Sequence, residues 1–153
     1  MVRIERKARF EAPVGEVFTY IADFRTLEDY NPSLGRVRQL DEGPPGLGGR
    51  FELTLCMLGL KLRTLLTITE FEENQLIATR LDAFVPADEI RVFRAEGDHT
   101  LFLFSIEFST GWPLVGPLAD RLLARFFAEP QAETELRHLA KRFNSTTGTC
   151  TTR

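Results

Sequence analysis

Residues 120–130 read DRLLARFFAEP, and the apolar side chains of this stretch are typical of a helix that covers one face of a sheet. Leucine, valine and phenylalanine recur at helical spacing from residue 113 to residue 143. After Pro130 the apolar positions move sideways around the predicted helix axis, so we expect a kink at this proline. We predict that Leu122 and Phe126 lie on the covering face and line a cavity beneath the helix.

The chain before this helix alternates between apolar and polar residues in a series of short segments. The first, Val2–Phe10, is followed by two short helical patterns that end at Asn31-Pro32. Six further strands are predicted at residues 37–40, 51–57, 60–68, 76–81, 89–96 and 100–109. Consecutive strands with short turns favour an antiparallel sheet. We therefore predict an α+β fold in which about seven strands curve around a long C-terminal helix, with two short helices after the first strand.

The length and composition are typical of one globular domain. We place this domain at residues 1–143 and predict a disordered polar tail at 144–153. The chain has 153 residues, of which 43% are hydrophobic, and a net charge of −3 without a basic cluster, so we expect no nucleic-acid partner. Apolar stretches end well short of the ~20 residues that a membrane span needs. The N-terminus has no signal-peptide pattern, so we predict a cytoplasmic protein with unpaired Cys56 and Cys150.

Motifs for metal, phosphate or covalent chemistry are absent from the sequence. The glycine-rich run GPPGLGG at 43–49 lacks the GK[ST] ending of a phosphate loop and leads into a strand. His99 and His138 are not part of an HExxH motif or a Cys/His cluster, and no GxSxG motif occurs. We therefore expect no metal ion and no cofactor.

Three segments of the chain are characteristic in sequence and in order: FEAPVGEVFTYIADFRTLEDYNP at 10–32, GPPGLGGRFEL at 43–53 and EGDHTLFLFSIEF at 96–108. With the order of the predicted elements, they resemble the START-like (SRPBCC, birch-pollen-allergen-like) superfamily, and most of all its polyketide cyclase/dehydratase and lipid-transport branch. The resemblance implies a helix-grip fold over residues 2–143, with a hydrophobic cavity between the sheet and the long helix. Members often carry tryptophan where this chain has Tyr30, which implies a hydroxyl group near the site.

The hairpin around Gly97-Asp98 predicts an Arg–Glu pair on the apolar face of the sheet. With glycine first, a two-residue turn places Arg91 opposite Phe104, and residues two apart on a strand share a face. The inward candidates are Glu89, Arg91, Phe93, Phe102 and Phe104. The pair could bind an oxygen atom of an otherwise apolar ligand, or a bulge or the wet rim of the sheet could leave it solvated. The sequence leaves both alternatives open.

Two further polar residues interrupt apolar faces. Arg6 falls among the apolar residues of the first strand and is either a ligand contact for an anionic oxygen or an arginine that reaches the edge of the sheet. Thr64 interrupts the face formed by Leu60, Leu62, Leu66 and Ile68. Its hydroxyl group is a candidate hydrogen-bond partner for a ligand, unless the backbone satisfies it.

The opposite face of the same hairpin has its own apolar group, formed by Ile90, Val92, Leu101 and Leu103. Apolar clusters on an exposed sheet face often mark contact surfaces. We therefore predict a homodimer or partner surface there, with cover by Arg94 and its neighbours as the alternative.

Three functions are compatible with these residues. The first is the binding of a small hydrophobic molecule, lipid-, polyketide- or aromatic-like, in a mostly apolar pocket. The second is cofactor-free cyclisation or dehydration of a polyketide-like substrate, with acid–base or oxyanion help from Arg91, Glu89, Arg6 or Tyr30. The third is a protein-interaction domain that uses the outer sheet face.

Overall fold

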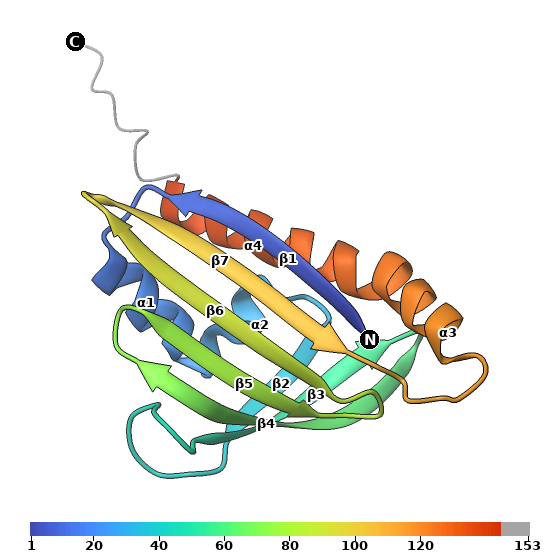
Figure 1. Ribbon diagram of the computed structural model, residues 1–153. Coiled ribbons are helices and arrows are strands. Elements are labelled where there is room, and N and C mark those ends of the chain that lie inside the picture. Colours follow the sequence, from blue (N-terminus) through green and yellow to red (C-terminus); the bar gives the residue numbers. More distant parts are fainter. Residues whose placement is uncertain (145–153) are drawn as a thin grey trace.

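The computed structural model describes residues 1–144 and contains one seven-stranded antiparallel sheet that curls around a long C-terminal helix (Figure 1). The strand order is β1-β7-β6-β5-β4-β3-β2, so each strand from β2 to β6 pairs with the next strand along the chain, and β1 pairs with β7. The strands are β1 (Val2–Phe10), β2 (Leu34–Gln39), β3 (Arg50–Met57), β4 (Leu60–Glu72), β5 (Leu76–Asp82), β6 (Ala87–Glu96) and β7 (His99–Phe108). The predicted α+β helix-grip fold is confirmed.

Short helices after β1 form where the sequence carries helix-start signals. α1 (Val14–Ala22) begins after Pro13, whose carbonyl oxygen accepts hydrogen bonds from the amides of residues 16 and 17 at 3.1 Å. Asp23 caps the 3₁₀ turn η1 (Phe24–Thr26) by accepting from the Arg25 amide at 3.1 Å. The next helix, α2 (Leu27–Tyr30), is followed by Asn31, the residue before Pro32, whose backbone is extended.

The aromatic core fills the end of the sheet next to α1 and the C-terminus of the long helix. Phe143 packs against Phe10 with ring centroids 5.4 Å apart, and Phe10 against Phe102 at 5.6 Å. Phe18 of α1 meets Phe93 of β6 edge-on at 5.0 Å. These rings are almost completely buried, so this end of the fold is closed by packed phenylalanine side chains.

The C-terminal helix differs from the prediction at its centre. It consists of α3 (Gly116–Leu123), a π-helical turn η2 (Ala124–Ala128) and α4 (Glu129–Asn144). The amide of Glu129 donates to the carbonyl oxygen of Ala124, five residues earlier. Pro130 has no amide hydrogen and its ring disfavours a regular turn before it, so the wide turn takes up the mismatch. The irregularity therefore lies before the proline, whereas we predicted a kink at the proline itself.

The covering face of this helix was also predicted wrongly. Leu122 is 48% exposed and Phe126 is 72% exposed, so neither lies under the sheet. The small residues Ala124 and Ala132 are buried instead. Alanine lets the helix backbone approach the sheet closely, and the wide turn adds a residue that rotates the later side chains around the axis. Leu118, Leu122 and Phe126 face outward, whereas Leu123 and Phe127 of the same apolar stretch face the cavity.

The C-terminal boundary and the cysteines are placed as follows. Asn144, predicted as the first residue of the tail, ends α4, and its side-chain oxygen accepts from the Glu11 amide at 2.9 Å. Residues 145–153, including Cys150, lie outside the described residues. Cys56 is a free, exposed cysteine in β3. Within residues 1–144, no helix is both long enough and apolar enough to cross a membrane.

Candidate functional site

A cavity of about 130 Å³ lies between the concave face of the sheet and the C-terminal helix. Its walls are mostly aliphatic and aromatic, with side chains from β3, β4, β7 and η2 such as Leu53, Leu66, Ile106, Phe108 and Phe127. An apolar cavity of roughly 150 Å³ accommodates a benzene-sized molecule. The space therefore suits a ring-sized apolar group.

One part of the cavity wall is charged and centres on Arg91, whose side chain is 2% exposed. Its Nη2 atom lies 3.1 Å from Glu89 Oε2 and 3.5 Å from Glu135 Oε1. The guanidinium also lies over the rings of Phe24, at 5.1 Å, and Phe104, at 5.6 Å. Arg91 is therefore held by two carboxylates and two aromatic faces, a setting that favours its charged form.

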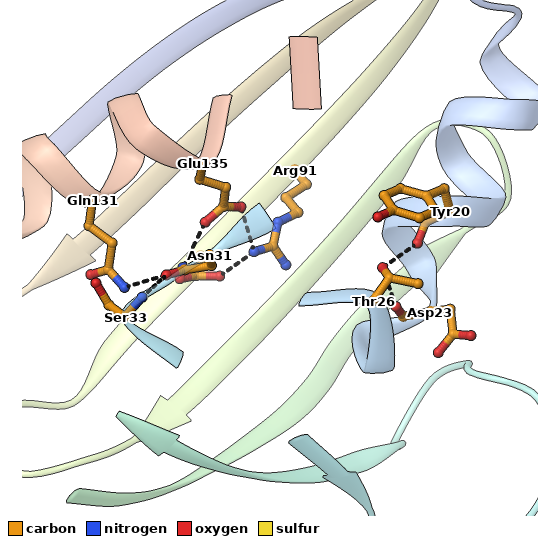
Figure 2. A network of polar contacts seen from close by, with 9 residues as sticks. Tyr20, Asp23, Thr26, Asn31, Ser33, Arg91, Gln131 and Glu135 are labelled. Atoms are coloured by element: carbon orange, nitrogen blue, oxygen red, sulfur yellow. Dashed lines mark hydrogen bonds and ion pairs between the residues drawn. The ribbon is translucent and has the colours of Figure 1, made fainter. Parts of the chain in front are cut away.

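Glu135 of α4 is oriented by a chain of amide contacts that Figure 2 shows from close by. The Asn31 side-chain nitrogen donates to Glu135 Oε2 at 3.0 Å, and Asn31 Oδ1 accepts from the Gln131 side chain at 3.1 Å and from the Ser33 amide at 3.2 Å. These contacts tie the loop after α2 to α4. They also fix the orientation of the Asn31 amide and hence the position of the Glu135 carboxyl group.

Burial changes the proton affinity of this group of side chains. Desolvation raises the pKa of Glu135 to about 7, although Arg91 opposes the shift. Burial alone would lower the pKa of Arg91, but the carboxylates of Glu89 and Glu135 hold it above its usual value. Burial also raises the pKa of Tyr30, which stays a neutral phenol. The site therefore combines a permanent cation with a carboxyl group that exchanges its proton near neutral pH.

Several buried polar atoms in or near the cavity wall have no hydrogen-bond partner within residues 1–144. They are the hydroxyl oxygens of Tyr30, Thr64 and Thr79 and the Nε and Nη1 atoms of Arg91. Leaving such atoms unpaired in the interior costs about 1–3 kcal/mol each. Thr64 and Arg91 belong to the cavity wall, so their free hydrogen-bonding capacity is within reach of a molecule in the cavity. Side chains that could hold a metal ion are not grouped anywhere in the described residues.

Four of the predicted site residues lie in the cavity wall: Thr64, Glu89, Arg91 and Phe104. The hairpin register is the one that the two-residue turn predicts, with Arg91 opposite Phe104 and Glu89 opposite Ile106. Gly97 has a φ of 62°, as the first position of this turn requires. No bulge intervenes, so the pair is buried rather than solvated.

The other predicted residues lie elsewhere. Phe93 and Phe102 are buried in the aromatic core, 5.3 Å apart, and not in the cavity wall, because α1 covers their part of the sheet. Arg6 is at the edge, where its side chain is 31% exposed and lies 3.5 Å from Glu133. Its long stem lets the guanidinium reach solvent, as in the alternative considered for it.

Tyr30, Leu122 and Phe126 also do not belong to the cavity wall. Tyr30 is 2% exposed and packs against Tyr20 at 5.9 Å, outside the cavity lining. Leu122 and Phe126 point outward, and their neighbours Leu123 and Phe127 line the cavity instead.

Glu135, Asn31 and Gln131 were not predicted as site residues. Glu135 follows Ala132 by three positions and precedes Leu139 by four, so it lies on the same buried helix face as both. An acidic residue within that apolar stripe was a readable signal. Asn31 was assigned only the role of ending a helix.

The outer face of the hairpin is less exposed than its composition suggests. Ile90 is 40% exposed, whereas Val92, Leu101 and Leu103 are half-buried. Leu101 lies opposite Arg9 and Leu103 opposite Lys7 on the neighbouring β1, where long charged side chains can cover them. The homodimer surface stays a prediction.

Known proteins similar to this chain share its fold. The family described as polyketide cyclase / dehydrase and lipid transport matches residues 1–144. TTHA0849 from Thermus thermophilus has a TM-score of 0.78 at 18% identity and covers 96% of this chain and 100% of its own. The Zhui aromatase/cyclase from Streptomyces sp. R1128 has a TM-score of 0.79 at 16% identity, with 97% and 96% covered. A START superfamily protein from Mycobacterium smegmatis has a TM-score of 0.75 at 18% identity, and the match covers 94% of this chain and 98% of that protein. No curated protein matches the chain.

Proposed function

Because the chain belongs to the polyketide cyclase/dehydrase and lipid transport family, we propose that its cavity binds a small, mostly apolar molecule that carries an oxygen atom. The apolar walls supply affinity through burial, at about 25 cal/mol per Å² of apolar surface. The polar part of the wall supplies orientation, as a few polar groups do in most small-molecule pockets.

One observation carries this proposal: the buried hydroxyl group of Thr64 and the Nε and Nη1 atoms of Arg91 have no partner in the described chain, and both residues line the cavity. A hydroxyl or carbonyl oxygen of a ligand can complete their hydrogen bonds. A pure hydrocarbon cannot, so the site discriminates between two ligands that differ by one oxygen.

Naphthalene and 1-naphthol test this proposal, since they share a ring system and differ by one hydroxyl group. Their affinities are measured by displacement of a fluorescent hydrophobic dye from the wild-type protein and from Thr64→Val. The variant has nearly the same shape but no hydroxyl group, so 1-naphthol should bind about 5–10-fold more weakly, the equivalent of one hydrogen bond. Naphthalene should bind equally to both proteins.

The matched control is Thr67→Val, which makes the same change in the same strand on the outer face of the sheet. This variant should leave both affinities unchanged. Failure of either compound to displace the dye from the wild-type protein would refute ligand binding. Equal affinities of 1-naphthol for the wild-type protein and Thr64→Val would refute the role of Thr64.

Glu135 favours a second function, cofactor-free cyclisation or dehydration of a polyketide-like substrate. A carboxyl group with a pKa of about 7 can both accept and donate a proton at neutral pH, and Arg91 beside it can stabilise an enolate oxygen. Glu135→Gln keeps an acceptor for Asn31 but cannot transfer a proton. The variant should retain 1-naphthol binding and lose turnover of a poly-β-ketone substrate, whereas unchanged turnover would refute this role.

A further inference from the structure

The exposed apolar side chains gather at one end of the sheet. Of the 13 large hydrophobic side chains that are exposed in residues 1–144, nine lie on the β3–β4 hairpin, the β5–β6 loop or the segment 112–126. Met57 pairs with Leu60, Leu81 with Ala87, and Ala87 with Phe108, so these connections lie at the same end of the sheet. Figure 1 shows α3 beginning there, beside the N-terminus.

Six of these side chains form what we call the rim: Leu58, Leu60, Phe84, Leu118, Leu122 and Phe126. Their exposed fractions run from 48% for Leu122 to 91% for Leu58. The rim adjoins the cavity, because Phe84 itself and the neighbours Met57 and Phe127 belong to the cavity lining. A group of exposed apolar side chains of this kind, with polar residues around it, is typical of an interaction surface.

Most of the charges that remain without an ion-pair partner at this end are positive. Lys61, Arg121 and Arg125 are exposed, and none of them forms an ion pair with another residue in the described part of the chain. Among the acidic groups nearby, Glu129 forms no ion pair within residues 1–144, but two others are already engaged. Asp82 lies 3.7 Å from Arg80, and the buried Asp120 accepts from the Thr110 amide at 2.7 Å. The rim is therefore locally cationic although the whole chain has a net charge of −3.

We propose that this end of the protein docks on an anionic lipid bilayer. The rim side chains enter the interfacial layer, and Lys61, Arg121 and Arg125 lie at the level of the headgroups, the combination by which amphipathic surfaces bind membranes. A two-fold dimer through the rim is disfavoured, because its symmetry places the same cations opposite one another. The proposal rests on the surface alone and is independent of what the cavity holds.

Vesicle flotation tests the proposal with the purified chain. Vesicles of phosphatidylcholine alone are compared with vesicles of phosphatidylcholine and phosphatidylserine, at low and high salt. The wild-type protein should float with the anionic vesicles and dissociate at high salt. Arg121→Gln/Arg125→Gln should bind about 30-fold more weakly, since each cation near an anionic surface contributes about 1 kcal/mol. Leu122→Ser/Phe126→Ser should lose binding to the anionic vesicles, because two of the side chains that enter the interfacial layer are then polar.

Matched controls alter the same kinds of residue away from the rim. Lys7→Gln/Arg94→Gln removes two exposed cations that lie on the outer face of the sheet, away from the rim. Ile90→Ser removes an exposed apolar side chain from the same face. Both controls should float like the wild-type protein, and thermal unfolding should show that every variant is folded. Absence of flotation by the wild-type protein, or equal loss in the control and rim variants, would overturn the proposal. So would a lipid-free dimer in light scattering that Leu122→Ser/Phe126→Ser dissociates, because it would assign the rim to self-association.

Discussion

Replacing Arg91 by methionine would test the charged part of the cavity most directly. Methionine keeps much of the apolar stem but removes the charge that two carboxyl groups share, at 3.1 Å for Glu89 and 3.5 Å for Glu135. Both carboxyl groups are largely buried, with 13% and 8% of their side chains exposed. Removing one partner of a buried ion pair costs about 3–5 kcal/mol. We expect a loss of this size for Arg91→Met at pH 8, where Glu135 is mostly ionised.

The loss should become smaller at pH 5. Glu135, with a pKa of about 7, is protonated there and no longer requires a counter-charge. The triple variant Arg91→Met/Glu89→Met/Glu135→Gln should recover most of the stability at both pH values, because it removes all three charges and keeps the acceptor for Asn31. Arg94→Met is the matched control in the same strand, and since Arg94 is exposed it should change the free energy of unfolding by less than about 0.5 kcal/mol.

Urea unfolding followed by circular dichroism measures these free energies by linear extrapolation, provided that the slopes agree between variants. We expect Arg91→Met to lose about 3–5 kcal/mol at pH 8. If its free energy of unfolding is instead within about 1 kcal/mol of the wild-type value, the guanidinium is not buried between the carboxylates. A triple variant as unstable as Arg91→Met would instead assign the loss to packing, and the electrostatic account would be wrong.

Three other variants have definite expected outcomes. The pKa of Glu135 rises from 4.5 to about 7 on folding, so the native state binds more protons in this interval and wild-type stability should fall by about 3 kcal/mol as the pH rises through it. Glu135→Gln should abolish that slope in urea unfolding measured from pH 4.5 to pH 8, and an unchanged slope would contradict the assignment. Leu139→Ala should cost about 2–5 kcal/mol, because its side chain is fully buried, whereas Phe126→Ala should cost less than about 0.5 kcal/mol. Thermal unfolding of both variants checks this contrast, and a large loss for Phe126→Ala would mean that the outward face is assigned wrongly.

The strand part of the site could be predicted because its determinants are local. Gly97 at the first position of a two-residue turn sets the register of β6 against β7, and the two-residue period of a strand then places Arg91 and Glu89 on the apolar face. Thr64 is placed by the same alternation in β4. No distant residue has to be known for these assignments, and the antiparallel sheet follows from the short turns between consecutive strands.

The tertiary structure alone decided how the long helix meets the sheet and what completes the site. Helical periodicity identifies a wide apolar stripe but does not show which edge of it is buried: Leu123 and Phe127 line the cavity, whereas Leu122 and Phe126 face outward. The π-turn at Ala124–Ala128 then shifts the later side chains around the axis by an amount that the period of a regular helix does not contain. Glu135 consequently meets Arg91, 44 residues away, through long-range packing, and burial there raises its pKa. Desolvation depends on all the atoms that surround a group, and only the folded chain brings those atoms together.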